Sequence, residues 1–245
     1  MLLGVVLLYV GVVLVINGIW LIGQARAAAA ERSAPAARQT SAREAAVVGA
    51  SAGEAAAGQV SAGVPGPRQA SAGEASAASG AVAAVSGAER SPLFIQNREV
   101  AVINIFTGFV GVVAAVTLLV QGNRVGDLAS VRASGYILLF AFTYLWVAFN
   151  QFLNAGGRAF GWYCLFVAIT AIPAGIYVLQ AADGNTALIW LGIDWFAWAV
   201  LWALFWALLA LGRPIALFTG WVTVLVGVGT AWAFAIAILE GKVAF

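Results

Sequence analysis

An apolar run from about Thr186 to Leu211 sets the strongest limit on how this chain can fold. A helix needs roughly 20 apolar residues to cross a bilayer, so this run is long enough to span a membrane. Its tryptophans are spaced three, four and four residues apart and therefore share one helix face: Trp195, Trp198, Trp202 and Trp206. Each buried indole N–H needs a partner that lipid does not offer. This tryptophan ladder is either a helix-packing surface or a pore wall along which a small polar solute passes.

Composition places the whole chain in the same class. Its 245 residues are 63% hydrophobic and 9% charged, which is typical of an integral membrane protein. The net charge of +2, without a basic patch, gives no reason to expect a nucleic-acid partner. The single cysteine, Cys164, rules out an intrachain disulfide. Because the chain has no histidine, it lacks the commonest metal ligand, and we expect neither a metal nor a cofactor.

Six apolar segments predict an all-α membrane protein with six transmembrane helices. The segments cover about residues 2–23, 100–121, 135–153, 161–181, 187–211 and 215–239. The first has a possible signal-peptidase site at Ala25-Arg26-Ala27. However, it is longer than the apolar core of a signal peptide and no basic residue precedes it, so we expect it to remain as a helix.

Residues 26–98 have a different composition, rich in Ala, Gly and Ser, with scattered Arg and Glu. Ser-Ala pairs recur every ten residues from 41 to 72, but the repeat contains no Leu, Ile or Phe, so stacked copies would bury little. Glycines and four prolines interrupt any helix: Pro35, Pro65, Pro67 and Pro92. We interpret 26–98 as a mobile loop between a first helix at 1–25 and a membrane domain at 99–245. Partner binding by the loop is the alternative.

The arginines predict the orientation of the chain in the membrane. The loop after the first span is rich in arginine, and Arg26, Arg32 and Arg98 lie close to span ends, where the cytoplasmic bias of basic residues acts. The loop before the tryptophan ladder contains no basic residue. We therefore expect this long loop inside the cell and both termini outside.

Charged residues are expected to be absent from the interiors of the spans, with Asp127, Asp183 and Asp194 on the outer side. Ion-coupled transporters usually keep an ionisable group within the membrane, and ion channels need charged rings or carbonyl filters. The chain also lacks a Gly-rich phosphate-binding motif ending in Lys-Ser or Lys-Thr. What remains is a passive route for a neutral solute, a receptor-like sensor or a structural membrane protein, and no enzyme activity is expected.

Three other spans carry faces that match the ladder. The third has an aromatic face made by Phe142, Trp146 and Phe149. The first has an aliphatic stripe, Leu7, Val10 and Leu14, beside a glycine seam at Gly4, Gly11 and Gly18. Such a seam lets a neighbouring backbone approach closely, and Asn17 must find a polar partner at membrane depth. The sixth span has a threonine face, Thr219, Thr223 and Thr230, which either bonds to its own helix or meets a solute.

These stretches resemble the AmiS/UreI family of urea and amide channels. The matching residues are 7–14 with Asn17-Gly18, Phe142-Thr143-Tyr144-Leu145, 162–169 with Pro173, Trp195, Trp198, 200–202, Phe218-Thr219, Trp221 and 230–232. The resemblance covers all six spans. It implies a hexameric ring of six-helix protomers in the bacterial cytoplasmic membrane, each with its own pore and two constrictions. Constriction positions carry over to Leu7, Val10, Leu14, Phe142, Trp146, Trp195, Trp198, Leu201 and Trp202.

Three features depart from the family pattern. The acid-gated family member relies on histidines, which this chain lacks, and its outer carboxylates would titrate near about pH 4, so we do not expect acid gating. The buried glutamate of the family's sixth helix falls at Val226, on the face of Thr223 and Thr230, which adds Thr223 and Val226 to the expected solute path. The loop at 26–98 is foreign to the family's core.

The expected function is therefore a passive channel for urea, short aliphatic amides or both. Aromatic faces can stack on a planar amide, while indole N–H and threonine hydroxyl groups replace part of its water. The alternative is a membrane sensor or scaffold whose loop recruits a cytosolic amidase or urease. Membrane lipid and further copies of the chain are the other expected partners.

Overall fold

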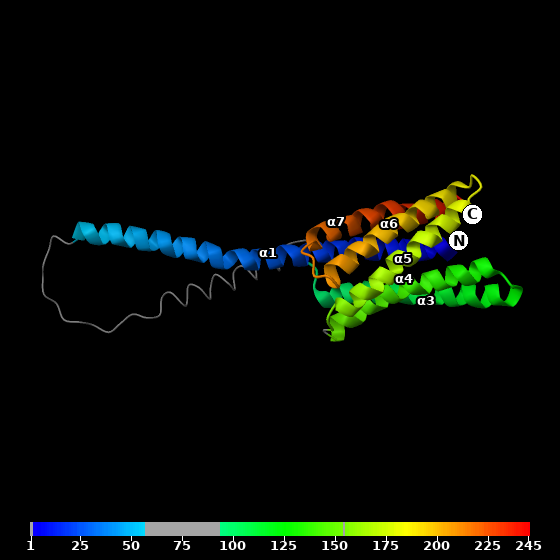
Figure 1. The fold of residues 1–245 in the computed structure, drawn as a ribbon, viewed down its shortest axis with the longest axis horizontal. Helices are drawn as coiled ribbons and strands as arrows, with labels where there is room; N and C mark the ends of the chain where they lie inside the picture. Colours follow the sequence, from blue (N-terminus) through cyan, green and yellow to red (C-terminus); the bar gives the residue numbers. More distant parts are fainter. Residues whose placement is uncertain (1, 57–93, 154) are drawn as a thin grey trace. The chain divides into compact units, whose positions relative to one another are not determined.

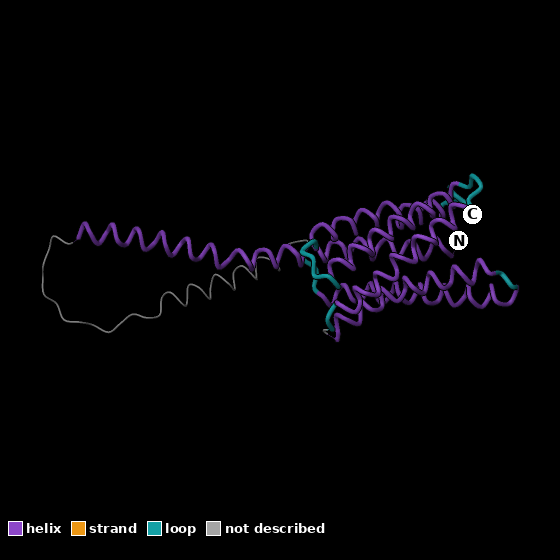
Figure 2. Tube along the Cα trace, in the orientation of Figure 1, coloured by secondary structure: helices purple, strands orange, loops and turns teal. Residues whose placement is uncertain are grey.

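The structure, a computed structural model, describes residues 2–56, 94–153 and 155–245. These residues form helices and connecting turns, with no strand among them (Figures 1 and 2). The helices are α1 Leu2–Ala56, α3 Asn97–Val125, α4 Leu128–Leu153, α5 Arg158–Gln180, α6 Thr186–Leu209, α7 Ala216–Val226, η1 Gly227–Trp232 and α8 Ala233–Leu239. The predicted all-α class is confirmed.

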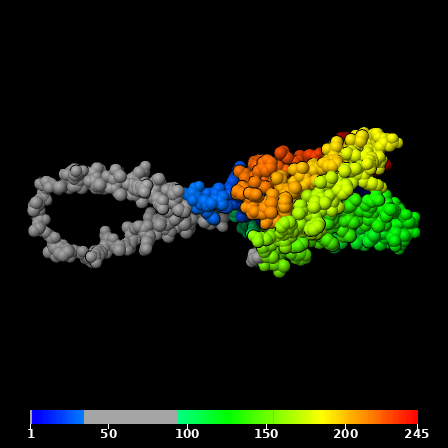
Figure 3. Space-filling model, in the orientation of Figure 1, coloured from blue at the N-terminus to red at the C-terminus, as the bar shows by residue number. Residues whose placement is uncertain are grey.

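Six helices in the described part of the chain are long and apolar enough to cross a membrane. They are Leu2–Ala34, Asn97–Val125, Leu128–Leu153, Arg158–Gln180, Thr186–Leu209 and Ala216–Leu239. The last combines α7, η1 and α8, since the π-helical turns of η1 continue α7 directly into α8. The outer faces of these helices carry large exposed apolar side chains, such as Phe166 on α5 and Phe218 on α7, which suit a surface in lipid. In the space-filling view, α5, α6 and α7 cover part of one face of the membrane unit (Figure 3).

The chain divides into two compact units, residues 1–22 with 95–245, and residues 23–94. Helix α1 crosses this boundary, because it continues to Ala56 through Pro35. The expectation of a loop from residue 26 is therefore wrong for 26–56. Alanine has the highest helix propensity, and the alanines of this stretch outweigh the interruptions at Pro35, Gly49 and Gly53. The remainder of the predicted loop, at 57–93, lies outside the described residues.

Two helical hairpins build much of the membrane unit, one from α3 with α4 and one from α5 with α6 (Figure 1). The α3–α4 turn is tight because Gly126 takes a left-handed conformation, φ 71°, that ends α3. The α5–α6 turn uses two such residues, Asp183 at φ 41° and Gly184 at φ 78°. The Asn185 side chain then accepts a hydrogen bond from the Leu188 N–H at 3.1 Å, which caps α6.

The glycine seam of α1 packs against the sixth membrane helix, which confirms the predicted close approach. A Cβ placed on Gly11 would lie 2.6 Å from the Trp232 Cβ, and one on Gly18 would lie 2.7 Å from the Gly220 carbonyl oxygen. Neither position has room for a side chain. The seam therefore sets how closely α1 and the α7–η1–α8 helix approach each other.

Asn17 and Asn104 join α1 to α3 inside the membrane unit. The Asn104 Nδ2 donates to the Asn17 Oδ1 at 2.7 Å, and the Asn17 Nδ2 donates to the Asn104 Oδ1 at 3.1 Å. Both side chains are buried. The prediction that Asn17 needs a polar partner is confirmed, and the pair satisfies two amides where lipid would satisfy neither.

Candidate functional site

A cavity of about 170 Å³ lies among α1, α3, α4, α5 and α6. One end of its lining comes from residues near helix ends, including Leu3 and Tyr177, and the other from mid-helix positions, including Leu14 and Trp202. Because a helix rises about 1.5 Å per residue, the step from Leu3 to Leu14 covers roughly 16 Å, about half of a hydrocarbon core. The cavity therefore runs from one end of the bundle to near its middle.

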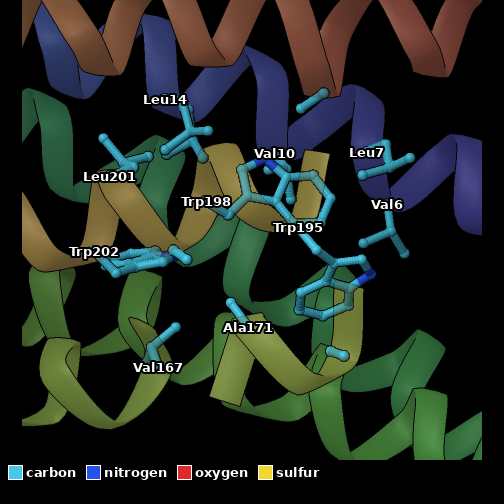
Figure 4. Packing of buried hydrophobic residues seen from close by; sticks show 14 of the residues in the cluster. Val6, Leu7, Val10, Leu14, Val167, Ala171, Trp195, Trp198, Leu201 and Trp202 are labelled. Carbon is cyan, nitrogen blue, oxygen red and sulfur yellow. The ribbon is translucent and has the colours of Figure 1, made fainter. Parts of the chain in front are cut away.

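Helix α6 supplies one wall of this cavity. Trp195, Trp198, Leu201 and Trp202 all line it and all are buried (Figure 4). Trp195 and Trp198 meet edge to face, with ring centroids 5.2 Å apart. Their spacing places them on one helical face, so the predicted alignment of the ladder is borne out for these positions. Trp206 is not among the lining residues and packs beside Trp162, with centroids 6.2 Å apart.

Helix α1 supplies the facing wall through the predicted aliphatic stripe. Leu7, Val10 and Leu14 line the cavity opposite the α6 tryptophans, and all three are buried (Figure 4). Their side chains cannot hydrogen-bond, so the wall is apolar. Seven residues of the predicted path are thus brought together: Leu7, Val10, Leu14, Trp195, Trp198, Leu201 and Trp202.

Helix α4 contributes an aromatic stripe that the sequence analysis missed. Tyr136, Phe140 and Tyr144 all line the cavity. The Phe140 ring contacts three tryptophans, with its centroid 5.4 Å from that of Trp195, 5.5 Å from Trp198 and 5.9 Å from Trp202. The signal was present in the sequence, because these three residues recur every four positions and so share a face.

The remaining four predicted path residues lie away from the cavity lining. Phe142 points outward and is 47% exposed, and Trp146 packs on Phe160 and Tyr163, with centroids 5.7 and 5.5 Å apart. Thr223 donates to the Thr219 carbonyl at 2.6 Å. Val226 offers its own carbonyl to another threonine hydroxyl. Thr223 therefore bonds within its own helix, which is the first of the two alternatives stated for the threonine face.

The indole N–H groups of the cavity differ in how they are satisfied. The Trp198 Nε1 donates to the Thr230 Oγ1 at 2.9 Å, and that hydroxyl donates to the Val226 carbonyl at 2.6 Å. The buried Nε1 atoms of Trp195 and Trp202 have no partner within the described ranges 2–56, 94–153 and 155–245. A buried donor without a partner is costly, so these two groups favour any solute that brings an acceptor.

Two charged residues bear on the expectation of uncharged span interiors: Arg132, which precedes the predicted span at 135–153, and Asp194, which contradicts the expectation. Arg132 lines the cavity from the second turn of α4, which begins before the predicted span. Asp194 is 2% exposed and about two turns inside α6, so the expectation that no carboxylate lies within this span is wrong. Its Oδ2 has no partner in the part of the chain that the structure describes. Asp194 itself is not among the lining residues.

Asp127 lies in the turn before α4 and holds the start of that helix. Its carboxylate accepts from the Ser130 hydroxyl at 2.6 Å and from the Ala129 N–H at 2.9 Å. The hydrogen bonds, that of the Ser130 hydroxyl above all, lower the pKa of the Asp127 carboxyl below its usual value. The Asp127 carboxylate is therefore engaged in hydrogen bonds at the start of α4, and it stays ionised at neutral pH.

The six membrane-capable helices agree with the comparison to known proteins. The model of the AmiS/UreI family of transporters matches residues 78–242. The chain belongs to the AmiS/UreI family. The resemblance stated from the sequence is thereby confirmed.

Several relatives within this family are similar to the chain. A Mycolicibacterium smegmatis protein named for the transport of amidate substrates is 37% identical over 149 residues, which cover 60% of this chain and 67% of the relative. The acid-activated urea channel of Helicobacter pylori (strain ATCC 700392 / 26695) is 32% identical over 168 residues, covering 56% and 82%. The crystal structure of the H. pylori urea channel superposes with a TM-score of 0.62 at 25% identity, covering 99% of both chains.

Proposed function

We propose that this protein is a passive channel for urea and short aliphatic amides in the bacterial cytoplasmic membrane. The observation that carries the proposal is the apolar cavity with the unpartnered N–H groups of Trp195 and Trp202 in its wall. Urea and amides are planar, neutral and rich in carbonyl and amino groups. An aromatic wall can stack on their faces, and two indole N–H groups can each donate a hydrogen bond to a carbonyl oxygen. The names of the AmiS/UreI relatives support the same solute class.

The proposed path follows the cavity lining. It uses Leu7, Val10 and Leu14 on one side and the α6 tryptophans on the other, with Phe140 between Trp195, Trp198 and Trp202. Phe142, Trp146, Thr223 and Val226 lie away from this cavity, and the proposed path does not use them. In its middle stretch the path has no charged group that could replace the water an ion loses, so ions are rejected there. Neutral solutes bind only weakly and therefore leave again.

The finer features of the proposal come from the sequence and from family resemblance. Both termini face outside, the protomers form a hexamer and the channel is not acid-gated. With this orientation the end of the cavity near Leu3 and Tyr177 opens to the outside, since α1 begins there. A functional link to an amidase or a urease suits a channel that delivers their substrates.

Solute flux into proteoliposomes tests the function directly. Purified protein is reconstituted, and stopped-flow light scattering follows vesicle volume after mixing with urea, acetamide or glycerol. We expect urea and acetamide to enter several times faster than in protein-free vesicles, and glycerol to remain near the protein-free rate, because it lacks a planar face and a carbonyl acceptor. Equal acceleration of all three solutes, or acceleration of none, would contradict an amide channel.

A further inference from the structure

Arg132 is distinct among the described residues that line the cavity, because it alone is charged. Its guanidinium carbon lies 4.0 Å from the centroid of the Tyr177 ring, and Tyr177 lines the cavity as well. This stacking holds the guanidinium group against an aromatic face at the Leu3 and Tyr177 end of the cavity. The Nη1 atom of Arg132 is buried and has no hydrogen-bond partner in the described ranges. The group is therefore a fixed positive charge with an unused donor.

No neighbouring carboxylate neutralises this charge within the described residues. Asp127 is bonded to the Ala129 N–H and the Ser130 hydroxyl, and the ion pair that the structure records joins Lys242 to Glu240 at 2.6 Å. No ion pair between Asp194 and Arg132 is recorded among the described residues.

We propose that Arg132 is an acyl-oxygen binding site at the mouth of the cavity, which captures the carbonyl group of an amide and is blocked by short aliphatic carboxylates. The proposal rests on the proposed function for the passage of amides. A guanidinium presents parallel N–H donors to a planar acceptor, and it holds a carboxylate more strongly than a neutral carbonyl because that bond is charge-assisted. An amide then moves on past Trp195, whereas a carboxylate meets the uncharged walls at Leu14 and Trp202 and cannot follow.

The primary test measures how acetate inhibits acetamide flux in proteoliposomes. Acetate is placed at equal concentration on both sides at neutral pH, so that it creates no osmotic gradient. We expect inhibition in the wild-type protein and an inhibitory concentration about tenfold higher in Arg132→Gln, because a hydrogen bond to a charged group is lost. Arg132→Lys keeps the charge and should fall between the two. Unchanged inhibition in Arg132→Gln, or none in the wild type, overturns the proposal.

The matched control is Arg124→Gln. Arg124 is exposed in the last turn of α3, at the same end of the bundle, but it does not line the cavity. Its loss removes the same charge from the same side and should leave acetate inhibition unchanged. A similar effect of both substitutions would mean that acetate responds to surface charge in general and would contradict a site at Arg132. Tyr177→Phe, which keeps the ring, should behave as wild type, and Tyr177→Leu should weaken inhibition.

A second readout is independent of transport. Saturation-transfer NMR detects acetate bound to the protein in detergent micelles, and we expect the signal to disappear in Arg132→Gln and to persist in Arg124→Gln. If the wild type binds acetate through Arg132 but passes no amide, the proposed function fails while the binding site stands. If amides pass but acetate neither binds nor inhibits, the site at Arg132 is refuted and the channel stands.

Discussion

The cavity tryptophans differ at the level of single atoms in a way that decides their roles. The Trp198 N–H is committed to the Thr230 hydroxyl, so this ring is fixed between α6 and η1. The N–H groups of Trp195 and Trp202 have no such partner in the described chain. We therefore propose solute contact for these two residues, whereas the Trp198 ring ties α6 to η1.

Replacing Trp195 with phenylalanine separates the donor from the ring. Trp195→Phe keeps an aromatic face beside Phe140 but removes the indole N–H. One neutral hydrogen bond contributes about 0.5–1.5 kcal/mol, so we expect the half-saturating urea concentration for flux to rise by about two- to tenfold. Trp206→Phe is the control, because its N–H is also unpartnered in the described chain but lies outside the cavity lining. An equal effect of both substitutions would argue against solute contact at Trp195.

At the scale of helices, the close packing of α1 on the sixth membrane helix holds the aliphatic stripe against the cavity. The glycine seam and the stripe lie side by side on α1, so a shift of the helix would move Leu7, Val10 and Leu14 together. The seam is therefore a requirement for the shape of the cavity as well as for stability.

A methyl group at Gly11 should disturb this contact. In Gly11→Ala the new Cβ would lie 2.6 Å from both the Cβ and the backbone nitrogen of Trp232, so a backbone must move. Overpacking of this kind costs about 1–3 kcal/mol of folding stability, so we expect a lower thermal midpoint. The midpoint is measured in detergent by size-exclusion chromatography. Gly229→Ala is matched to it, since a Cβ there meets nothing within 4 Å. Equal midpoints for Gly11→Ala and the wild type would show that α1 does not pack as described.

The sequence predicted these elements unevenly, for physical reasons. The length of the apolar runs identifies the membrane helices, and the spacing of the tryptophans identifies the ladder, because both are local properties of the sequence. Which face of α4 turns inward is not local, and the Phe142 face and the Phe140 face are similarly aromatic. Packing against α6 selects Phe140. Asp194 was misplaced because a carboxylate near a span end usually lies in water, and its burial depends on how α6 begins at Thr186.

For the molecule as a whole, the distribution of titratable groups predicts a weak response to pH. The chain has no histidine, and hydrogen bonds lower the pKa of Asp127, which therefore stays ionised from about pH 7.5 to about pH 5.5. Because the pKa of Asp127 is lowered, the ionised carboxylate contributes fully to the stability of the folded protein throughout that window. This contribution is lost only as the pH falls through the lowered pKa. We expect urea flux in proteoliposomes to change little over this range.

The buried carboxylate of Asp194 provides the control for that expectation. Asp194→Asn keeps the shape of the side chain and removes its capacity to ionise, so its flux should be equally constant with pH. A steep rise in wild-type flux on acidification would contradict a channel without acid gating. Loss of that rise in Asp194→Asn would assign the sensor to this residue.

Whether solutes pass through the cavity lined by Trp202 is decided by the solute selectivity of the Trp202→Ala variant. Truncating this ring opens the inner end of the cavity, so the variant should insert normally and show a raised ratio of butyramide to urea flux. Trp232→Ala is the control, because Trp232 is 46% exposed and its substitution keeps the Cβ that meets Gly11. A Trp→Ala change in a packed core costs about 3–5 kcal/mol and depletes a protein from the membrane. We expect Trp202→Ala to reach normal abundance in the membrane with a raised ratio of butyramide to urea flux, and Trp232→Ala to match the wild type in both. Loss of Trp202→Ala from the membrane, or an unchanged flux ratio at normal abundance, would show that solutes do not pass along Trp202.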